Sequence, residues 1–166
     1  MAKITEPREL LTHKLASMLY IERELAEKVL PELLDEISNP QLRSGIETHL
    51  AQTRGHVANL EQAFSLMGGE PETEKNAAFD GLVKDHNQLV KKLDSPALED
   101  VVHAGAAAKT EHFEIASYEG MINLADSFGE TEIVHLLEEN LDQEREALEQ
   151  VKLISRQLAV MQHATV

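Results

Sequence analysis

The chain has 166 residues, of which 42% are hydrophobic, and it contains no cysteine. Domains commonly contain about 100–150 residues, so we expect residues 1–166 to form a single domain with one core. The lack of cysteine excludes disulfides, thiolate metal sites and thiol nucleophiles, and it fits a cytoplasmic protein. The formal net charge of −15 opposes binding to nucleic acid, because affinity for phosphates depends on Lys and Arg contacts. Neither a signal-peptide pattern nor an apolar run of the ~18 residues that a membrane span needs is found, so we predict a soluble protein with no membrane partner.

Helical periodicity runs through nearly the whole chain, and Gly and Pro fall where helices would begin or end. We therefore predict an all-α protein with four long helices and one short helix. We expect the long helices at about residues 6–37, 96–128 and 130–162, and one from residue 40 to the MGGE sequence at 67–70. The short helix is expected at about 74–93.

Individual residues mark the expected ends of these helices. The start signals are Thr5, Asn39 followed by Pro40, and Ser95 followed by Pro96, and the stop signals are Gly68 or Gly69 and Gly129. Pro31 lacks a backbone N–H, so we expect it to kink the last third of the first helix.

The lengths of the connections predict how the helices are arranged. Tight turns follow the first and third long helices, and each turn makes an antiparallel hairpin. A long segment with the short helix joins the two hairpins. This is the topology of a ferritin-like four-helix bundle with one long crossover connection and a short extra helix between the second and third long helices.

Each long helix has a stripe of core positions spaced three and four residues apart, and a glutamate interrupts three of these stripes. The interrupting residues are Glu22, Glu111 and Glu144, and Glu114 lies one turn after Glu111. In the second long helix we expect the stripe Ile46, Leu50, Thr53, Val57, Leu60 and Phe64, with His49, Gln52 and His56 along its edge.

The heights of these side chains predict that they meet. When the first helix is folded back onto the second at residues 38–39, Glu22 comes level with about residue 55. When the third is folded onto the fourth at Gly129, Glu114 comes level with Glu144. Buried carboxylates without a counter-charge are costly, and no Lys or Arg lies in the stripes. We therefore predict two divalent metal ions, iron or manganese, bound by Glu22, Gln52, His56, Glu111, Glu114 and Glu144.

Plainer interpretations stay open for these residues. If the stripes are misplaced by one position, the glutamates lie on solvated faces. His49 or His56 could be a boundary residue, and Tyr118 could be a core side chain, a hydrogen-bond donor to the site or a redox-active phenol. We expect the remaining histidines to face solvent or, for His112, to point away from Glu111; they are His13, His86, His103, His112, His135 and His163.

Four segments resemble a known family: LYIERELAEKVLPEL, THLAQTRGHVANLEQAF, KTEHFEIASYEGMINLADSFG and LLEENLDQE. They are similar to the ferritin-like bacterial stress proteins typified by YciF and YciE. The resemblance implies a ferritin-like bundle, usually dimeric, with a dinuclear metal site to which Glu22, Glu111, Glu114 and Glu144 would belong. The family usually reads His-Leu-x-Glu-Thr-x-x-Gln in the second long helix, whereas this chain has Gln52 at the Glu position and His56 at the Gln position.

These observations lead to one functional hypothesis and its alternatives. We expect a homodimeric, dinuclear-metal stress protein that reacts with a small oxidant, peroxide or dioxygen. A manganese catalase is the alternative within the same chemistry. A non-catalytic structural or stress protein with a vestigial metal site is the alternative from another class. Iron storage would require a closed cage of many subunits.

Overall fold

The structure, a computed structural model, describes residues 3–163, with side chains described to Met161. The order of elements is α1 Pro7–Glu24, the π-helix η1 Leu25–Val29, α2 Leu30–Glu36, α3 Pro40–Leu66, α4 Ala77–Val90, α5 Pro96–Asp126 and α6 Thr131–His163. No strand occurs within residues 3–163. The all-α prediction is confirmed.

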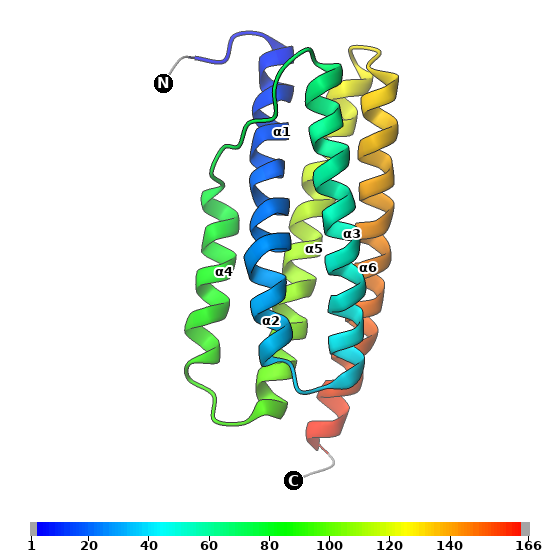
Figure 1. The fold of residues 1–166 in the computed structure, drawn as a ribbon. Coiled ribbons are helices and arrows are strands. Elements are labelled where there is room, and N and C mark those ends of the chain that lie inside the picture. Colours follow the sequence, from blue (N-terminus) through cyan, green and yellow to red (C-terminus); the bar gives the residue numbers. More distant parts are fainter. Residues whose placement is uncertain (1–2, 164–166) are drawn as a thin grey trace.

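Four long rods form the bundle (Figure 1), and the elements α1, η1 and α2 together make the first of them. The second, third and fourth rods are α3, α5 and α6. The chain leaves the upper end of α3, descends through α4 on the outside of the bundle and enters α5 at the lower end. This long connection with its extra helix is the crossover that the sequence predicts.

Local signals set most of the helix ends as expected. The side-chain oxygen of Asn39 accepts hydrogen bonds from the backbone N–H groups of Gln41 and Leu42 and so caps α3. Gly68 and Gly129 have φ of 79° and 72°, the left-handed conformation that favours glycine after a helix. The prediction of Thr5 as a cap is wrong. The cap position is occupied by residue 6, because the Glu9 carboxylate reaches back to the N–H groups just before α1.

The disturbance expected at Pro31 takes the form of a π-helix. Pro31 has no N–H to donate to the carbonyl of Glu27, and the five residues Leu25–Val29 just before α2 widen into a π-helix. The backbone N–H of Leu30 bonds to the carbonyl of Leu25, five residues earlier. The first rod therefore changes its helical geometry one turn after Glu22.

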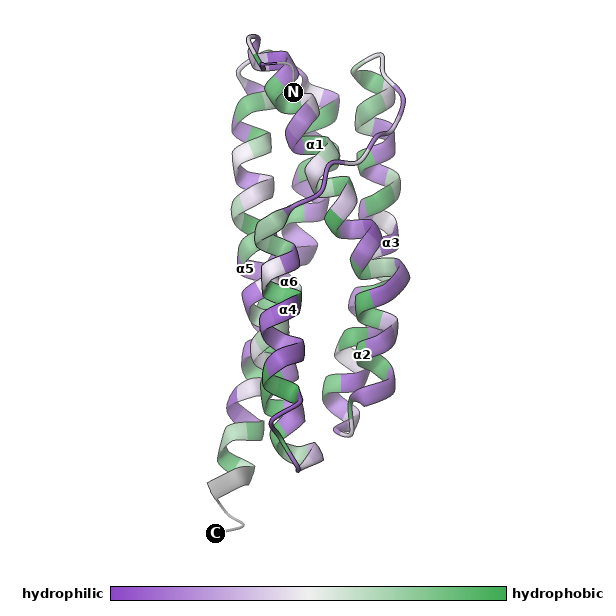
Figure 2. Ribbon diagram, turned by 90° about the vertical axis from the view of Figure 1, so that its left-hand side faces the viewer, coloured by the Kyte–Doolittle hydropathy of each residue, from purple (hydrophilic) through white to green (hydrophobic). Residues whose placement is uncertain are grey.

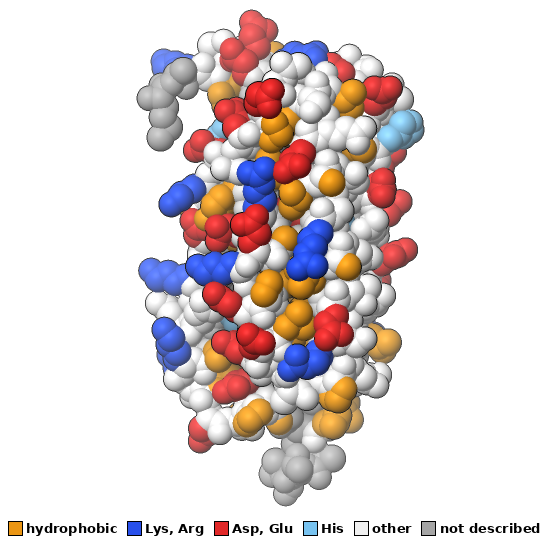
Figure 3. Space-filling view, viewed as in Figure 1, with side chains coloured by type: hydrophobic (Ala, Val, Ile, Leu, Met, Phe, Trp, Pro, Cys, Tyr) orange, Lys and Arg blue, Asp and Glu red, His pale blue; other side chains and the backbone are white. Residues whose placement is uncertain are grey.

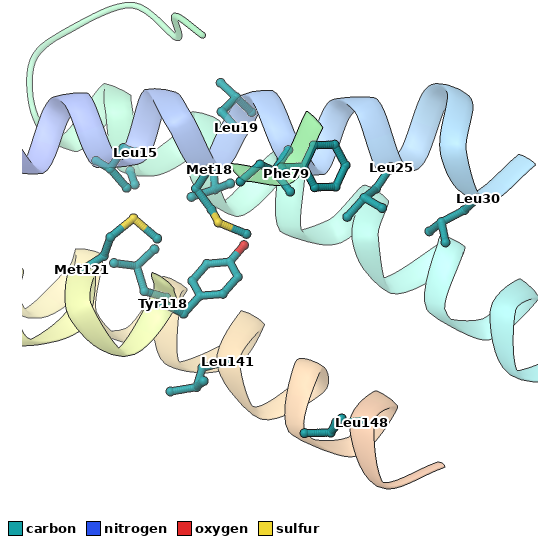
Figure 4. Close-up of a cluster of buried hydrophobic side chains, with 14 of the residues drawn as sticks. Leu15, Met18, Leu19, Leu25, Leu30, Phe79, Tyr118, Met121, Leu141 and Leu148 are labelled. Carbon is teal, nitrogen blue, oxygen red and sulfur yellow. The ribbon is translucent and has the colours of Figure 1, made fainter. Parts of the chain in front are cut away.

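The hydrophobic core runs along the axis of the bundle. Hydrophobic and hydrophilic residues alternate along every rod (Figure 2), which is typical of helices with one buried face. In the core, Leu15 and Met18 of α1 lie opposite Tyr118 and Met121 of α5, with Leu141 of α6 below them (Figure 4). None of the described helices is long and apolar enough to cross a membrane.

Two of the predicted stripes are displaced. The buried side of α3 carries His49, Thr53 and His56, whereas Leu50 and Val57 are only half-buried. In α5 the buried residues after Glu111 are Glu114, Tyr118, Met121 and Ala125, and the predicted Ile115 and Ile122 are half-buried. Both helices are rotated from the phase of greatest hydrophobicity, and the rotation turns more polar groups toward the axis.

Candidate metal centre

Four glutamates from three helices lie inside the bundle. Glu22 of α1, Glu114 of α5 and Glu144 of α6 are 0% exposed, and Glu111 of α5 is 3% exposed. Each lies on the buried face of its helix, among the apolar residues of the hydrophobic core. The alternative in which these glutamates face solvent is therefore excluded.

Two histidines of α3 complete the group. His49 and His56 are seven residues apart, so they lie two turns apart on one face of the helix, and both are buried. The Nε2 atom of His49 is 3.3 Å from a carboxylate oxygen of Glu111. The Nδ1 atom of His56 is 3.0 Å from Glu144 and 3.3 Å from Glu22.

The six side chains divide into two sets of suitable ligand atoms. One set contains His49, Glu111, Glu114 and Glu144, and the other contains Glu22, His56 and Glu144. Within each set, one ligand atom from each residue lies within 4.8 Å of the others. Glu144 belongs to both sets, so its carboxylate is placed to bridge two ions.

The hydrogen bonding of these groups is incomplete without a cation. The buried oxygens and nitrogens that lack a hydrogen-bond partner include both oxygens of Glu114, both of Glu144, one each of Glu22 and Glu111, and a ring nitrogen of each histidine. No Lys or Arg is among the buried residues in the described part of the chain. Four ionised carboxylates carry four negative charges, and two divalent ions would balance them. The donor set fits a dinuclear site of oxygen and imidazole ligands.

Burial and mutual repulsion shift the titration of the carboxyl groups. Burial, together with the neighbouring Glu144, raises the pKa of Glu111 and Glu114 well above the usual range. Burial also raises the pKa of Glu22, although His56 opposes the shift. Burial acts in the same direction on Glu144, but the neighbouring Glu111 carboxyl group and the rings of His56 and His49 outweigh it and hold the pKa of Glu144 at about 2. Glu144 is therefore ionised at neutral pH.

The two histidines are shifted in opposite directions. Burial lowers the pKa of His56, but Glu22 and Glu144 outweigh this effect and raise it to about 10. For His49 burial dominates, and its pKa lies below the usual range. Without metal, the centre is therefore a set of carboxyl groups around a protonated His56.

A hydrogen-bonded chain of side chains supports one end of the centre. The hydroxyl of Tyr118 donates to Glu22, and the amide of Asn140 donates to the Tyr118 hydroxyl at 3.0 Å. Asn59 in turn donates to the Asn140 side-chain oxygen at 2.8 Å. Tyr118 is thus a core tyrosine that is also a donor to the site, because burial and nearby carboxylates raise its pKa and keep it protonated.

Gln52, which the sequence predicts as a ligand, lies at the edge of the cluster, and its role as a ligand stays a prediction. Gln52 is half-buried and lies beside His49 at a small cavity next to Glu111, whereas His49, left open as an alternative, belongs to one of the two sets. The physical reason is the rotation of α3, which turns the face carrying His49 and His56 inward and leaves Gln52 at its edge. Spacing could not have shown this, because Leu50 and Val57 are also seven residues apart on the neighbouring face.

Two polar residues of α6 that lie near the cluster were not predicted from the sequence. Asn140 is fully buried four residues before Glu144, and its position one turn away on the same face was the available signal. Gln143 is half-buried, and its side-chain oxygen is 3.2 Å from Nε2 of His56. If this nitrogen carries the proton, the Nδ1 atom that faces Glu22 and Glu144 is free to bind a metal.

Of the described histidines outside the centre, all but His86 and His103 follow the expectation. His13, His112 and His135 are exposed, as expected, whereas the side chain of His163 lies outside the described residues. His103 is completely buried, because α4 packs over α5 at this level. Its Nδ1 atom is 2.9 Å from Nε2 of the half-buried His86. The prediction that His86 and His103 face solvent is wrong.

A bundle with one long crossover, and with buried carboxylates and imidazoles at mid-height, defines the class of ferritin-like helical-bundle proteins. The chain belongs to the DUF892 family, described as a domain of unknown function, whose pattern matches residues 6–164. The resemblance inferred from the sequence is confirmed.

Relatives from two bacteria share both sequence and fold with this chain. Protein YciF of Escherichia coli K12 is 28% identical over 134 residues, which cover 80% of each chain. The crystal structure of this E. coli stress protein matches with a TM-score of 0.88 at 24% identity, covering 94% of this chain and 98% of that chain. YcfI of Rhodopseudomonas palustris, which has been proposed to be a structural protein, matches with a TM-score of 0.88 at 29% identity, covering 90% and 95%.

Proposed function

We propose that this protein binds two divalent ions, iron or manganese, at the buried Glu and His cluster and reacts with peroxide or dioxygen during stress. One set of ligands would be His49, Glu111, Glu114 and Glu144, and the other Glu22, His56 and Glu144. Bound iron or manganese would supply the electrons for reduction of the oxidant. Membership of a family that includes the stress protein YciF supports the physiological setting.

The unpartnered buried atoms of the four glutamates carry this proposal. Each uncompensated carboxylate inside a bundle costs several kcal/mol, so a purely structural core would favour apolar residues at these positions. Two cations would satisfy the orphaned oxygens and balance their charge. Glutamates at these four positions are therefore explained by metal binding and not by core packing.

The surrounding residues have defined tasks in this proposal. Gln143 holds the ring of His56 so that Nδ1 faces the site. Tyr118 holds a proton at its hydroxyl oxygen and directs it to Glu22, while Asn140 fixes the orientation of that hydroxyl. The buried apolar residues around the cluster exclude bulk water.

Metal analysis of matched variants tests the binding step. Protein purified without chelators should contain two iron or manganese ions per chain, and Glu144→Gln should lose both because this residue belongs to both sets. Glu22→Gln should lose only one. The control is Glu146→Gln, an exposed position of the same helix, which should keep the full content. Loss of the same amount of metal in Glu146→Gln, or full content in Glu144→Gln, would contradict the proposed site.

Peroxide assays on the loaded protein test the reaction. Consumption of peroxide that depends on an added reductant supports the proposal, and release of dioxygen from peroxide without a reductant indicates a manganese catalase instead. A loaded protein that consumes neither peroxide nor dioxygen favours the non-catalytic alternative. This alternative is supported by the R. palustris relative, which has been proposed to be a structural protein.

A further inference from the structure

A large cavity lies between α4 and the bundle. Its volume is about 730 Å³, within the range of roughly 300–1,000 Å³ that is usual for small-molecule sites. The walls come from α4 on one side and from the first rod and α5 on the other. Figure 2 shows α4 from the outside, lying in front of the bundle at this place. His49 and Glu111, which belong to the candidate metal centre, line the cavity as well.

The walls of the cavity are mainly apolar. Leu25, Leu30 and Leu33 contribute from the first rod, and Phe79 and Val83 contribute from α4. The π-helix that begins at Leu25 forms part of this wall, directly after the helical turn that carries Glu22. The candidate metal centre and the cavity therefore share the same irregular segment of the first rod, and π-helices of this kind frequently occur at functional sites.

Small residues of α5 leave the cavity open. Gly105, Ala106 and Ala107 line it where larger side chains would otherwise fill the space under α4. A Cβ atom added at Gly105 would meet no atom within 4 Å. A glycine inside a helix costs about 1 kcal/mol relative to alanine, and here its absence of a side chain contributes free volume.

The charges around the cavity indicate which end of a ligand is polar. Its exposed lining residues carry both signs, for example Lys28 and Lys84 beside Glu32 and Asp80, so they select no net charge. Figure 3 shows acidic and basic side chains interspersed on the face seen there. At the inner end Glu111 lines the cavity and Glu144 belongs to the same set of ligand atoms, and these acidic groups disfavour an anionic ligand. The polar end of a ligand at this centre is therefore uncharged.

We infer that the cavity is a binding site for a linear aliphatic molecule with one uncharged oxygen group, such as a primary alcohol, and that this group lies at His49 and Glu111. The α5 residues of the cavity run from Val102 to Glu111, a length of ~13 Å that matches a chain of medium length. The assignment of the metal centre as the chemistry at the inner end rests on the proposed function. The apolar walls do not depend on it.

Calorimetric titration of the whole protein with octanol tests the inference. We expect saturable binding with a negative heat-capacity change, which marks burial of apolar surface, and weaker binding of butanol and of octanoate. The variant Gly105→Leu should fill the cavity and weaken octanol binding at least tenfold. The matched control Gly120→Leu replaces an exposed glycine of the same helix, where an added Cβ also meets no atom within 4 Å, and should bind octanol like the parent.

Ala106→Leu gives a second way to fill the cavity if Gly105→Leu does not fold. Absence of octanol binding to the parent, unchanged binding in the folded cavity-filling variants, or tighter binding of octanoate than of octanol would overturn the inference. Metal content is measured on the same samples to separate the two proposals. Octanol binding without metal supports the cavity and contradicts the dinuclear site, whereas metal without octanol binding overturns the cavity alone.

Discussion

At the scale of single residues, Glu144 and His56 determine how the centre behaves without metal. Glu144 is held ionised, with a pKa of about 2, and His56 is held protonated, with a pKa of about 10. The two atoms that face each other are 3.0 Å apart. The proton on Nδ1 of His56 thus occupies the place where the second set of ligands would bind a cation.

The affinity for metal should rise with pH through the neutral range. Below its pKa of about 10, His56 must lose a proton before it can bind a metal, and the raised pKa values of Glu111 and Glu114 act in the same direction. A histidine with the ordinary pKa of ~6.5 would weaken metal binding only below about that pH. Competition with a chelator between about pH 6 and 9 measures it.

The matched variants are His56→Ala and His135→Ala, of which the second alters an exposed histidine of α6. The first should bind metal more weakly and show a flatter pH dependence, because the proton that competes with the metal at Nδ1 of His56 is gone. The second should follow the parent. An affinity of the parent protein that does not change with pH would show that His56 does not compete with the metal.

Gln52→Glu should tighten metal binding about tenfold. The side chain lies beside His49 and Glu111, and a carboxylate there adds negative charge and can orient the imidazole. Metal titration of the parent and the variant measures the change. The control Gln62→Glu adds the same charge at an exposed position of α3 and should leave the affinity unchanged. Equal gains in both variants would mean that only the net charge acts.

At the scale of elements, α4 packs on α5 and is attached to α1 through a few side-chain contacts. Phe79 is buried and meets the ring of Tyr20 edge-on at 6.4 Å between centroids, and the Tyr20 hydroxyl donates to Asp80 at 2.7 Å. Asn76 donates to the hydroxyl of Ser17 at 2.9 Å. The position of α4 decides both the burial of His103 and the shape of the cavity, so this attachment connects packing with the proposed site.

Phe79→Ala should destabilise the protein by about 3–5 kcal/mol and loosen α4 before the rest of the bundle unfolds. Denaturant unfolding measures the first effect, and amide hydrogen exchange resolved along the chain measures the second. Leu89→Ala, at a 42%-exposed position of the same helix, should cost much less. If exchange in α4 were as slow in Phe79→Ala as in the parent, Phe79 would not be the anchor of this helix.

At the scale of the whole molecule, metal that binds the folded bundle and not the unfolded chain must stabilise it. At a free concentration of ~100 times the dissociation constant the gain is ~2.7 kcal/mol, which for a chain of this size raises the Tm by roughly 5–10 °C. Scanning calorimetry with iron, manganese and zinc measures the shift. Glu144→Gln should show none, and an unchanged Tm of the parent with all three metals would count against the centre.

The association state is also a property of the whole molecule. The family resemblance predicts a homodimer, and this remains a prediction. Sedimentation of the protein should give twice the chain mass of 18.5 kDa. The mass of a single chain would contradict the predicted dimer, and the mass of a large cage would favour iron storage.

The sequence by itself determined the helices and the bundle topology. Asn39 and Gly129 act through hydrogen bonds and backbone angles within a few residues of themselves, so local reasoning suffices for them. Glu22, Glu111 and Glu144 interrupt regular apolar stripes, and this pattern already placed them inside the bundle. The carboxylate part of the candidate centre was therefore predictable.

The tertiary structure decided the phase of α3 and the position of α4. Leu50 and Val57 have the same spacing of seven as His49 and His56, so periodicity alone favours the more hydrophobic pair, and only packing against the other helices turns the histidines inward. His103 is polar by sequence and is buried because a separate helix covers it. Such outcomes depend on contacts between residues far apart in the chain, which no local pattern records.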